Sequence, residues 1–108
     1  MAITTTYEAQ RKRQITTMSE TGVSEPFRMA GDFDVGVNGV TAGGGTAVLQ
    51  RCYDATITGA SAFRNVKSYT ADAEEVGSHG AGLGAWYRWS LTYVGGTVVL
   101  ELRRKAAS

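Results

Sequence analysis

The feature that most constrains the fold is a strict alternation of apolar and polar residues near the C-terminal end of the sequence. Apolar side chains recur at every second position over residues 85–93 and again over residues 98–102. A period of two is typical of β-strands, whose successive side chains point to opposite faces of a sheet. Gly95-Gly96 lies between the two runs and suits a tight turn, so the pattern predicts a β-hairpin. The core residues expected from it are Tyr87, Leu91, Val98 and Leu100.

Weaker patterns earlier in the chain predict further short strands. Phe33 and Val37 belong to one such alternating run, and residues 47–53 form another. Residues 14–18 and 74–76 are expected to be short strands. Residues 26–29 are expected to form an irregular or edge strand, because Pro26 cannot donate a ladder hydrogen bond. The spacing of Phe63, Val66 and Tyr69 breaks the alternation and predicts a strand that contains a β-bulge. The glycine-rich segment 77–84 is expected to be a flexible loop.

Composition agrees with a fold built from strands and turns. The 108 residues suffice for one domain, and 14 Gly with a single Pro indicate many tight turns. After residue 14 no apolar spacing has the helical period of 3.6 residues. We therefore expect an all-β fold, an antiparallel β-sandwich or small barrel of six to eight short strands. Helix should take up less than about a tenth of the chain, against about a third in ordinary globular proteins.

Basic residues gather at the two ends of the sequence. The net charge of +1 gives no general attraction for nucleic acid, but residues 14–102 carry five basic and nine acidic side chains, which leaves this body at 5 − 9 = −4. The terminal basic residues are Arg11, Lys12, Arg13, Arg103, Arg104 and Lys105. They either dock on an acidic neighbour or serve as solubilising ends.

This distribution suggests a division of the chain into three parts. Residues 1–13 offer almost no apolar face, so we expect an extended N-terminal arm that orders on assembly. Residues 14–103 are expected to form the β-sandwich domain, and residues 104–108 a C-terminal tail.

Residues that carry chemistry are few and scattered. His79 is the only histidine and has no partner at metal-ligand spacing, so we expect a surface side chain. Cys52 is the only cysteine, which precludes an intrachain disulfide and is typical of a buried small residue. Four acidic residues could meet and bind Ca²⁺, although acids on alternating strand positions are typical of a solvated face: Asp32, Asp34, Glu74 and Glu75. We therefore expect no catalytic residue, no metal and no cofactor, and the chain is not predicted to be an enzyme.

Trp86 is the aromatic residue whose role the sequence leaves open. It alternates with Tyr87 and therefore lies on the strand face opposite to the core. There it could bind a partner or stack on a sugar, as could Tyr53, or it could pack against another part of the chain.

The sequence contains no targeting or membrane signal of a known kind. No apolar stretch approaches about 18 residues, and the N-terminal segment lacks the apolar core of a signal peptide. We expect the chain to act without a membrane partner and to stay in the compartment where it is made.

An ordered set of motifs between residues 31 and 102 resembles a group of small virion proteins from tailed bacteriophages and prophages. The motifs are GDFDVGVNG at 31–39, GTAVLQRCYD at 45–54, FRNVKSYT at 63–70, EEV at 74–76, YR at 87–88 and GTVVL at 96–100. The chain departs from the group at three places. Cys52 stands where the group has Ser, Phe63 stands where it has Trp, and the loop 54–61 lacks the usual Asp-Gly-Gly turn.

The resemblance implies a compact β-sandwich in a virion, made in the cytoplasm of the bacterial host. Such proteins are commonly capsid decoration (cement) proteins, which bind the major capsid protein or other virion proteins and for which a trimer is the expected homo-oligomer. The alternatives are a head–tail connector or tail accessory protein, and a carbohydrate-binding module displayed on the virion. No catalytic residue, nucleic acid or cofactor is implied. The residues expected to contact a partner are Arg11, Lys12, Arg13, Trp86, Arg103 and Arg104.

Overall fold

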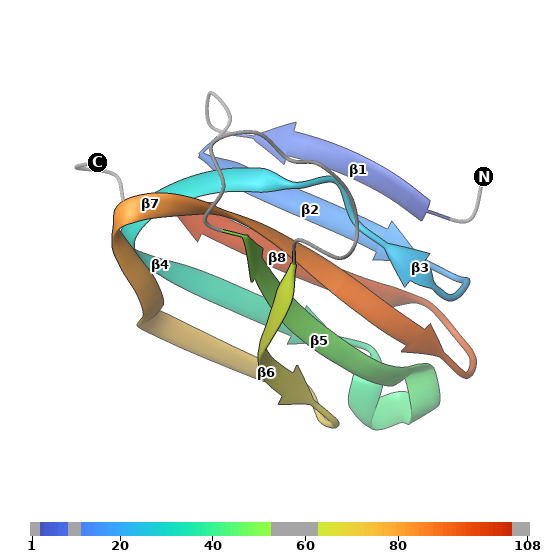
Figure 1. Cartoon of the computed structure of the whole chain (residues 1–108). Coiled ribbons are helices and arrows are strands. Elements are labelled where there is room, and N and C mark those ends of the chain that lie inside the picture. The colour runs from blue at the N-terminus through green and yellow to red at the C-terminus, as the bar shows by residue number, and fades with distance from the viewer. Residues whose placement is uncertain (1–2, 9–11, 53–62, 105–108) are drawn as a thin grey trace.

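The computed structural model describes residues 3–8, 12–52 and 63–104, with the backbone alone at residues 31–32 and 76–84. Strands make up 73% of the structure, so the predicted all-β class is confirmed (Figure 1). The strands are β1 (Ile3–Glu8), β2 (Arg13–Met18), β3 (Gly22–Val23), β4 (Phe27–Asn38), β5 (Gly45–Cys52), β6 (Arg64–Tyr69), β7 (Ala73–Tyr93) and β8 (Val98–Arg104). A short π-helical turn, η1, spans Val40–Gly44.

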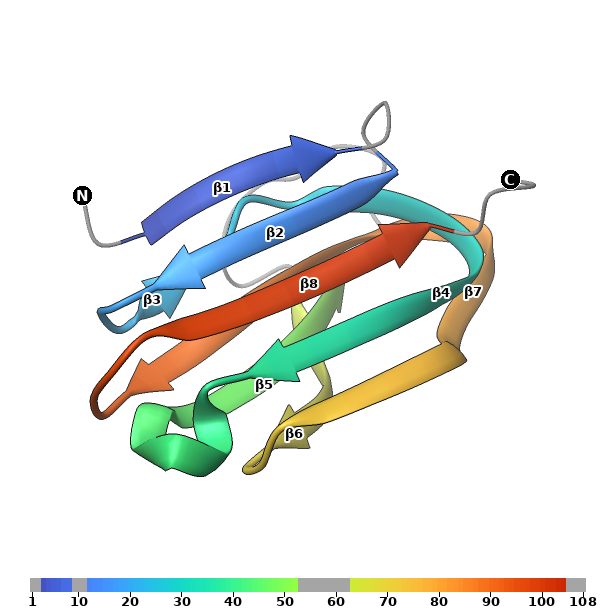
Figure 2. The same cartoon turned by 180° about the vertical axis from the view of Figure 1, so that it is seen from behind.

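All strand pairings are antiparallel, in the order β1-β2-β8-β4-β7-β5-β6, with β3 also paired to β7. The long strands β4 and β7 pair with each other and bend, so the sheet folds over on itself into two layers. In Figure 2 the layer of β1, β2 and β8 lies in front, and β5 lies behind it. The predicted antiparallel β-sandwich is therefore confirmed, and its strand number lies within the expected range.

The core lies between these two layers and follows the predicted alternation. Tyr87, Leu91, Val98 and Leu100 are all buried, as expected from the sequence. Aromatic contacts join the layers at the centre: the Phe33 and Tyr87 rings are 4.5 Å apart between centroids. Other apolar side chains that are completely or almost completely buried include Met18, Met29, Leu49, Trp89 and Leu102.

The prediction that residues 85–102 form a hairpin is wrong, although both of its strands exist and both faces are correctly assigned. Near its C-terminal end β7 pairs with β5 on one side and with β3 on the other. β8 pairs instead with β2 and β4. Because both edges of β7 are occupied here, the Gly95-Gly96 connection leads across the core into the opposite layer. The two apolar faces therefore face each other across the core instead of lying side by side.

The expected loop at residues 77–84 is also wrong, because these residues form the middle of β7. Their backbone runs antiparallel to β4, with Gly31 opposite Ala81 and Phe33 opposite Ser78. Three register shifts occur in this part of the pair. Glycine inside a strand commonly marks a bend or bulge, and here the glycine-rich sequence coincides with the passage of β7 between the layers.

Residues 1–13 were predicted to form an arm, but Ile3–Glu8 is strand β1, which pairs with β2 over all six residues. Ile3 and Tyr7 are half-buried and pack against the edge of the core. The intervening threonines favour an extended backbone. Arg13 begins β2, and Arg104 still belongs to β8. Strand structure therefore begins before residue 14 and continues one residue past residue 103.

The bulge expected in the strand after Phe63 is confirmed. Leu49 lies opposite Lys67, and the next residue of β5, Gln50, lies opposite Asn65. One residue, Val66, is therefore extra on β6, as in a β-bulge.

The turn η1 connects β4 to β5 and rests against the β7–β8 connection. It is flanked by Gly39 and Gly45, which have φ angles of 96° and 125°. The Asp72 carboxylate accepts hydrogen bonds from the backbone N–H groups of Val40 (2.7 Å) and Thr41 (2.9 Å). These hydrogen bonds, the one from Thr41 first, lower the pKa of Asp72 below its usual value. The Val94 N–H donates to the Gly44 carbonyl at 2.9 Å, which ties η1 to the connection between the layers.

Candidate partner-binding surface

The basic residues from the two ends of the chain lie side by side in the structure. Arg13 on β2 is the register partner of Arg103 on β8. The backbone N–H of Arg104 donates to the carbonyl of Lys12 at 2.7 Å. Because β2 begins where its antiparallel neighbour β8 ends, segments about 90 residues apart form one surface. The two docking arms considered from the sequence are therefore a single surface in the structure. We call this surface the basic end, and it consists of Lys12, Arg13, Arg28, Arg103 and Arg104.

Acidic side chains partly neutralise the basic end. Arg13 forms ion pairs with Glu8 (2.8 Å) and Glu101, and Glu101 also accepts from Arg103 at 3.3 Å. The hydrogen bond to Glu101 raises the pKa of Arg13. Asp34 lies opposite Arg103 in the β4–β8 register. The five cations and the three carboxylates Glu8, Asp34 and Glu101 sum to 5 − 3 = +2.

Arg104 lies against the body of the sandwich instead of forming a tail. Its guanidinium carbon lies 4.3 Å from the centroid of the Phe27 ring, close enough for a cation–π contact. Its Nε donates to the Arg28 carbonyl at 2.8 Å. Arg104 therefore joins the end of β8 to the beginning of β4 and extends the basic end toward Arg28.

Trp86 lies next to Arg28 on the outer face, where the sequence placed it. The two residues are register partners, and the Arg28 guanidinium carbon lies 5.9 Å from the indole centroid. Trp86 is half-buried, and its Nε1 is buried without a hydrogen-bond partner among the described atoms. The Arg28 guanidinium therefore lies over the indole ring. Tyr53, the other candidate for sugar stacking, lies outside the described residues, as does Arg11.

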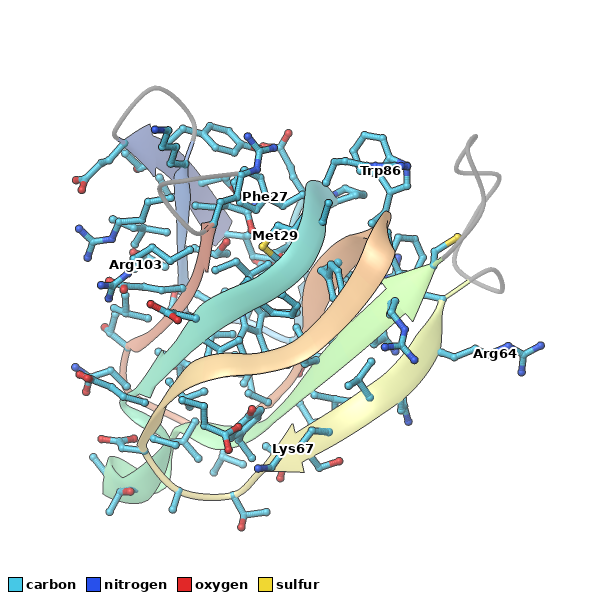
Figure 3. All side chains as sticks on the ribbon, turned by 90° about the vertical axis from the view of Figure 1, so that its left-hand side faces the viewer. Phe27, Met29, Arg64, Lys67, Trp86 and Arg103 are labelled. Carbon is cyan, nitrogen blue, oxygen red and sulfur yellow. The ribbon has the colours of Figure 1, made fainter. Side chains whose placement is uncertain are left out.

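Figure 3 shows the arrangement of these residues from the end of the molecule. Phe27 and Trp86 lie in the upper part of this view, with Trp86 to the right of Phe27, and Arg103 lies at its left. Arg64, on β6, extends from the opposite side. The basic end and the β6 edge are therefore separate surfaces.

Arg88 belongs to a small cluster on the outer face that sequence reasoning missed. It is only 8% exposed, and its guanidinium carbon lies 4.1 Å from the centroid of the Phe63 ring. Its Nε donates to Gln50 Oε1 at 2.7 Å, and burial lowers its pKa. Cys52 is buried, as predicted. Gln50 and Arg88 meet because β5 pairs with β7, a pairing that no motif in the sequence announces.

The other candidate sites have no assembled chemistry in the part of the chain that is described. The described residues contain no group of three His, Cys, Asp or Glu placed to hold a metal ion. Glu75, one of the four acids considered for Ca²⁺, instead accepts hydrogen bonds from Lys67 (2.8 Å) and Tyr69. The side chains of Asp32 and His79 lie outside the description.

A shallow hollow above Gly36 has a volume of about 110 Å³, well below the 300 Å³ or more typical of small-molecule sites. It lies on the outer face of β4 and β8, between Glu74, Glu101 and Arg103.

None of the helical structure in the described ranges is long and apolar enough to cross a membrane.

Comparisons with models of protein families, with curated proteins and with solved structures find no match to this chain.

Proposed function

We propose that this protein is a structural component of a tailed-phage virion, a decoration (cement) protein that binds the major capsid protein on the assembled head. The observation that carries the proposal is the basic end, where cations from both ends of the chain lie side by side and Arg28 lies next to the half-buried Trp86. The motif resemblance adds support, since its described segments lie in β4 to β8 or in the turns that join them. We propose no catalytic activity for the protein.

The proposed attachment combines charge with apolar contact. Exposed ion pairs contribute only about 0–1 kcal/mol each, so the cations would orient the protein more than hold it. Trp86, half-buried beside Arg28, is an apolar group available for burial against a capsid subunit. A protein that binds only the assembled shell stabilises the shell by mass action. The same surface would serve a head–tail connector or tail accessory protein, which differs in its copy number.

Neutralising the basic end should weaken attachment to the particle. We expect K12Q/R103Q to bind particles assembled without the protein about three- to tenfold more weakly than the parent, because exposed charge contacts are individually modest. The remaining binding should also depend less on salt concentration, since fewer screened charge contacts are left. Co-sedimentation with purified particles over a range of NaCl concentrations measures both effects.

The matched control is R64Q/K67Q, which also removes two positive charges but removes them from β6. Arg64 and Lys67 are exposed, and Arg64 extends from the side of the molecule opposite to Arg103 (Figure 3). The control should bind like the parent. Equal losses in both double variants would mean that net charge alone matters, and the basic end would then not be the attachment surface.

A further inference from the structure

The two outer strands of the sheet differ in how they are protected from pairing with another chain. β6 carries a bulge at Val66 and exposed cations at Arg64 and Lys67, features that discourage edge-to-edge association. β1 has neither feature: it matches β2 residue by residue without a register shift and contains no Lys, Arg or Pro. Its only charged residue is Glu8 at the end, which forms an ion pair with Arg13. Among the described residues β1 pairs with β2 alone, so its other edge is open.

We propose that β1 pairs antiparallel with β1 of a second copy of this chain, across a two-fold axis that passes through Thr5. This inference does not depend on the proposed virion function. A two-fold contact is self-complementary and closes at two copies, so it predicts a dimer in place of the trimer that the resemblance implies.

The pattern of side chains on β1 selects this register. Ile3, Thr5 and Tyr7 are half-buried and share the face toward the core, whereas Thr4 and Thr6 are exposed on the other face. A two-fold axis at Thr5 keeps each face continuous across the joint, because all paired positions differ by an even number of residues.

The side-chain pairs created by this register are favourable ones. Ile3 lies opposite Tyr7 of the partner subunit, an aromatic–β-branched pair that covers apolar surface still half-exposed in the single chain. Thr4 lies opposite Thr6 of the partner subunit, and threonine pairs are also favoured across strands. A second copy therefore matches this edge on both faces.

The charges do not oppose the contact. Glu8 is three residues from the axis, so its two copies lie about 20 Å apart at about 3.3 Å per residue. That separation exceeds the screening length of about 8 Å at physiological salt. The layer of β1, β2, β8 and β4 would continue across the joint into the same layer of the second copy.

A cysteine on the two-fold axis tests the register directly. In T5C the two introduced cysteines would have Cα atoms about 4.5–5.5 Å apart, within the range for a disulfide. We expect rapid formation of a covalent dimer under mild oxidation, read on a non-reducing gel. The control T6C places its cysteines about 8 Å apart, too far for a disulfide, and should cross-link much more slowly. The parent, whose only cysteine is buried, gives the background. Equal rates for T5C and T6C would overturn this register.

A pair of charge variants tests the contact in solution without a cross-link. In T4K/T6K each lysine would face a lysine of the partner subunit, and we expect the dimer dissociation constant to rise by at least about tenfold. In T4K/T6E each lysine would face a glutamate, and the dimer should persist. Analytical ultracentrifugation measures both, with circular dichroism to verify that the two variants are equally folded. A parent that sediments only as a monomer or a trimer would contradict the proposal, as would equal dissociation of the two folded variants.

Discussion

Replacing Leu100 with alanine should lower the free energy of unfolding by about 2–5 kcal/mol, the usual cost of truncating a fully buried leucine. Leu100 is completely buried and lies in the middle of β8, opposite Thr16 on β2 and Val37 on β4. Its removal leaves a cavity at a place where paired strands on both sides limit the collapse of the surroundings. Urea denaturation followed by intrinsic fluorescence gives the free energy.

The matched control for this variant is Val99→Ala. Val99 is the next residue on the same strand but lies half-buried on the outer face. It should cost less than about 1 kcal/mol, because fewer contacts are lost and solvent can fill the space. If the two variants have the same denaturation midpoint, the two faces of β8 are assigned the wrong way round.

Replacing Gly45 with alanine should be similarly damaging, for a reason that involves the backbone and not the core. Gly45 has a φ angle of 125°, which non-glycine residues rarely adopt, and a Cβ there would lie only 1.9 Å from the Thr92 carbonyl oxygen. The backbone strain costs about 1–3 kcal/mol. Displacing the β5–β7 pair to relieve the overlap adds about 1–3 kcal/mol more. Thermal and urea unfolding should both show the loss.

Gly43→Ala separates the two causes. Gly43 has a comparable φ angle of 100°, but a Cβ there would meet nothing within 4 Å. This variant should therefore lose only the strain energy, about 1–2 kcal/mol. Equal losses at Gly43 and Gly45 would show that the Gly45 backbone does not lie against the Thr92 carbonyl.

Alternation in the sequence predicts which face of a strand is buried but not which strand lies beside it. Residues 85–93 and 98–102 have the predicted faces, yet they lie in different layers. Gly95-Gly96 permits both a hairpin and a connection across the core. The choice depends on β5 and β3, which are distant in sequence and occupy the two edges of β7. A local pattern carries no information about such neighbours.

For two segments the local sequence pattern predicts the wrong structure, because pairing with a neighbouring strand outweighs the local preference of the residues. Ile3–Glu8 has only two apolar residues, as suits an edge strand that is half-buried, and so it resembled a disordered arm. Residues 77–84 are rich in glycine and resembled a loop, but pairing with β4 holds them in a strand. The bulge near Val66 was predictable because an extra residue shifts the apolar spacing within one strand.

The candidate surface was predictable in its members but not in its assembly. The sequence identified Arg13, Arg103 and Arg104 as basic residues at opposite ends of the chain. Only the β2–β8 pairing brings them together, with Glu101 between Arg13 and Arg103. Arg28 was not singled out, because its position beside Trp86 and Arg104 follows from the β4–β7 register.

The number and position of copies in the particle test the proposed function most directly. A cryo-EM map of the purified virion, with copy number checked by quantitative gel densitometry, would show where the chain lies. A decoration protein should be present in hundreds of copies on the outer head surface, over the joints between capsid subunits, with the basic end directed toward the shell. Density confined to the neck or tail, at about a dozen copies or fewer as in a single symmetric ring, would contradict this account.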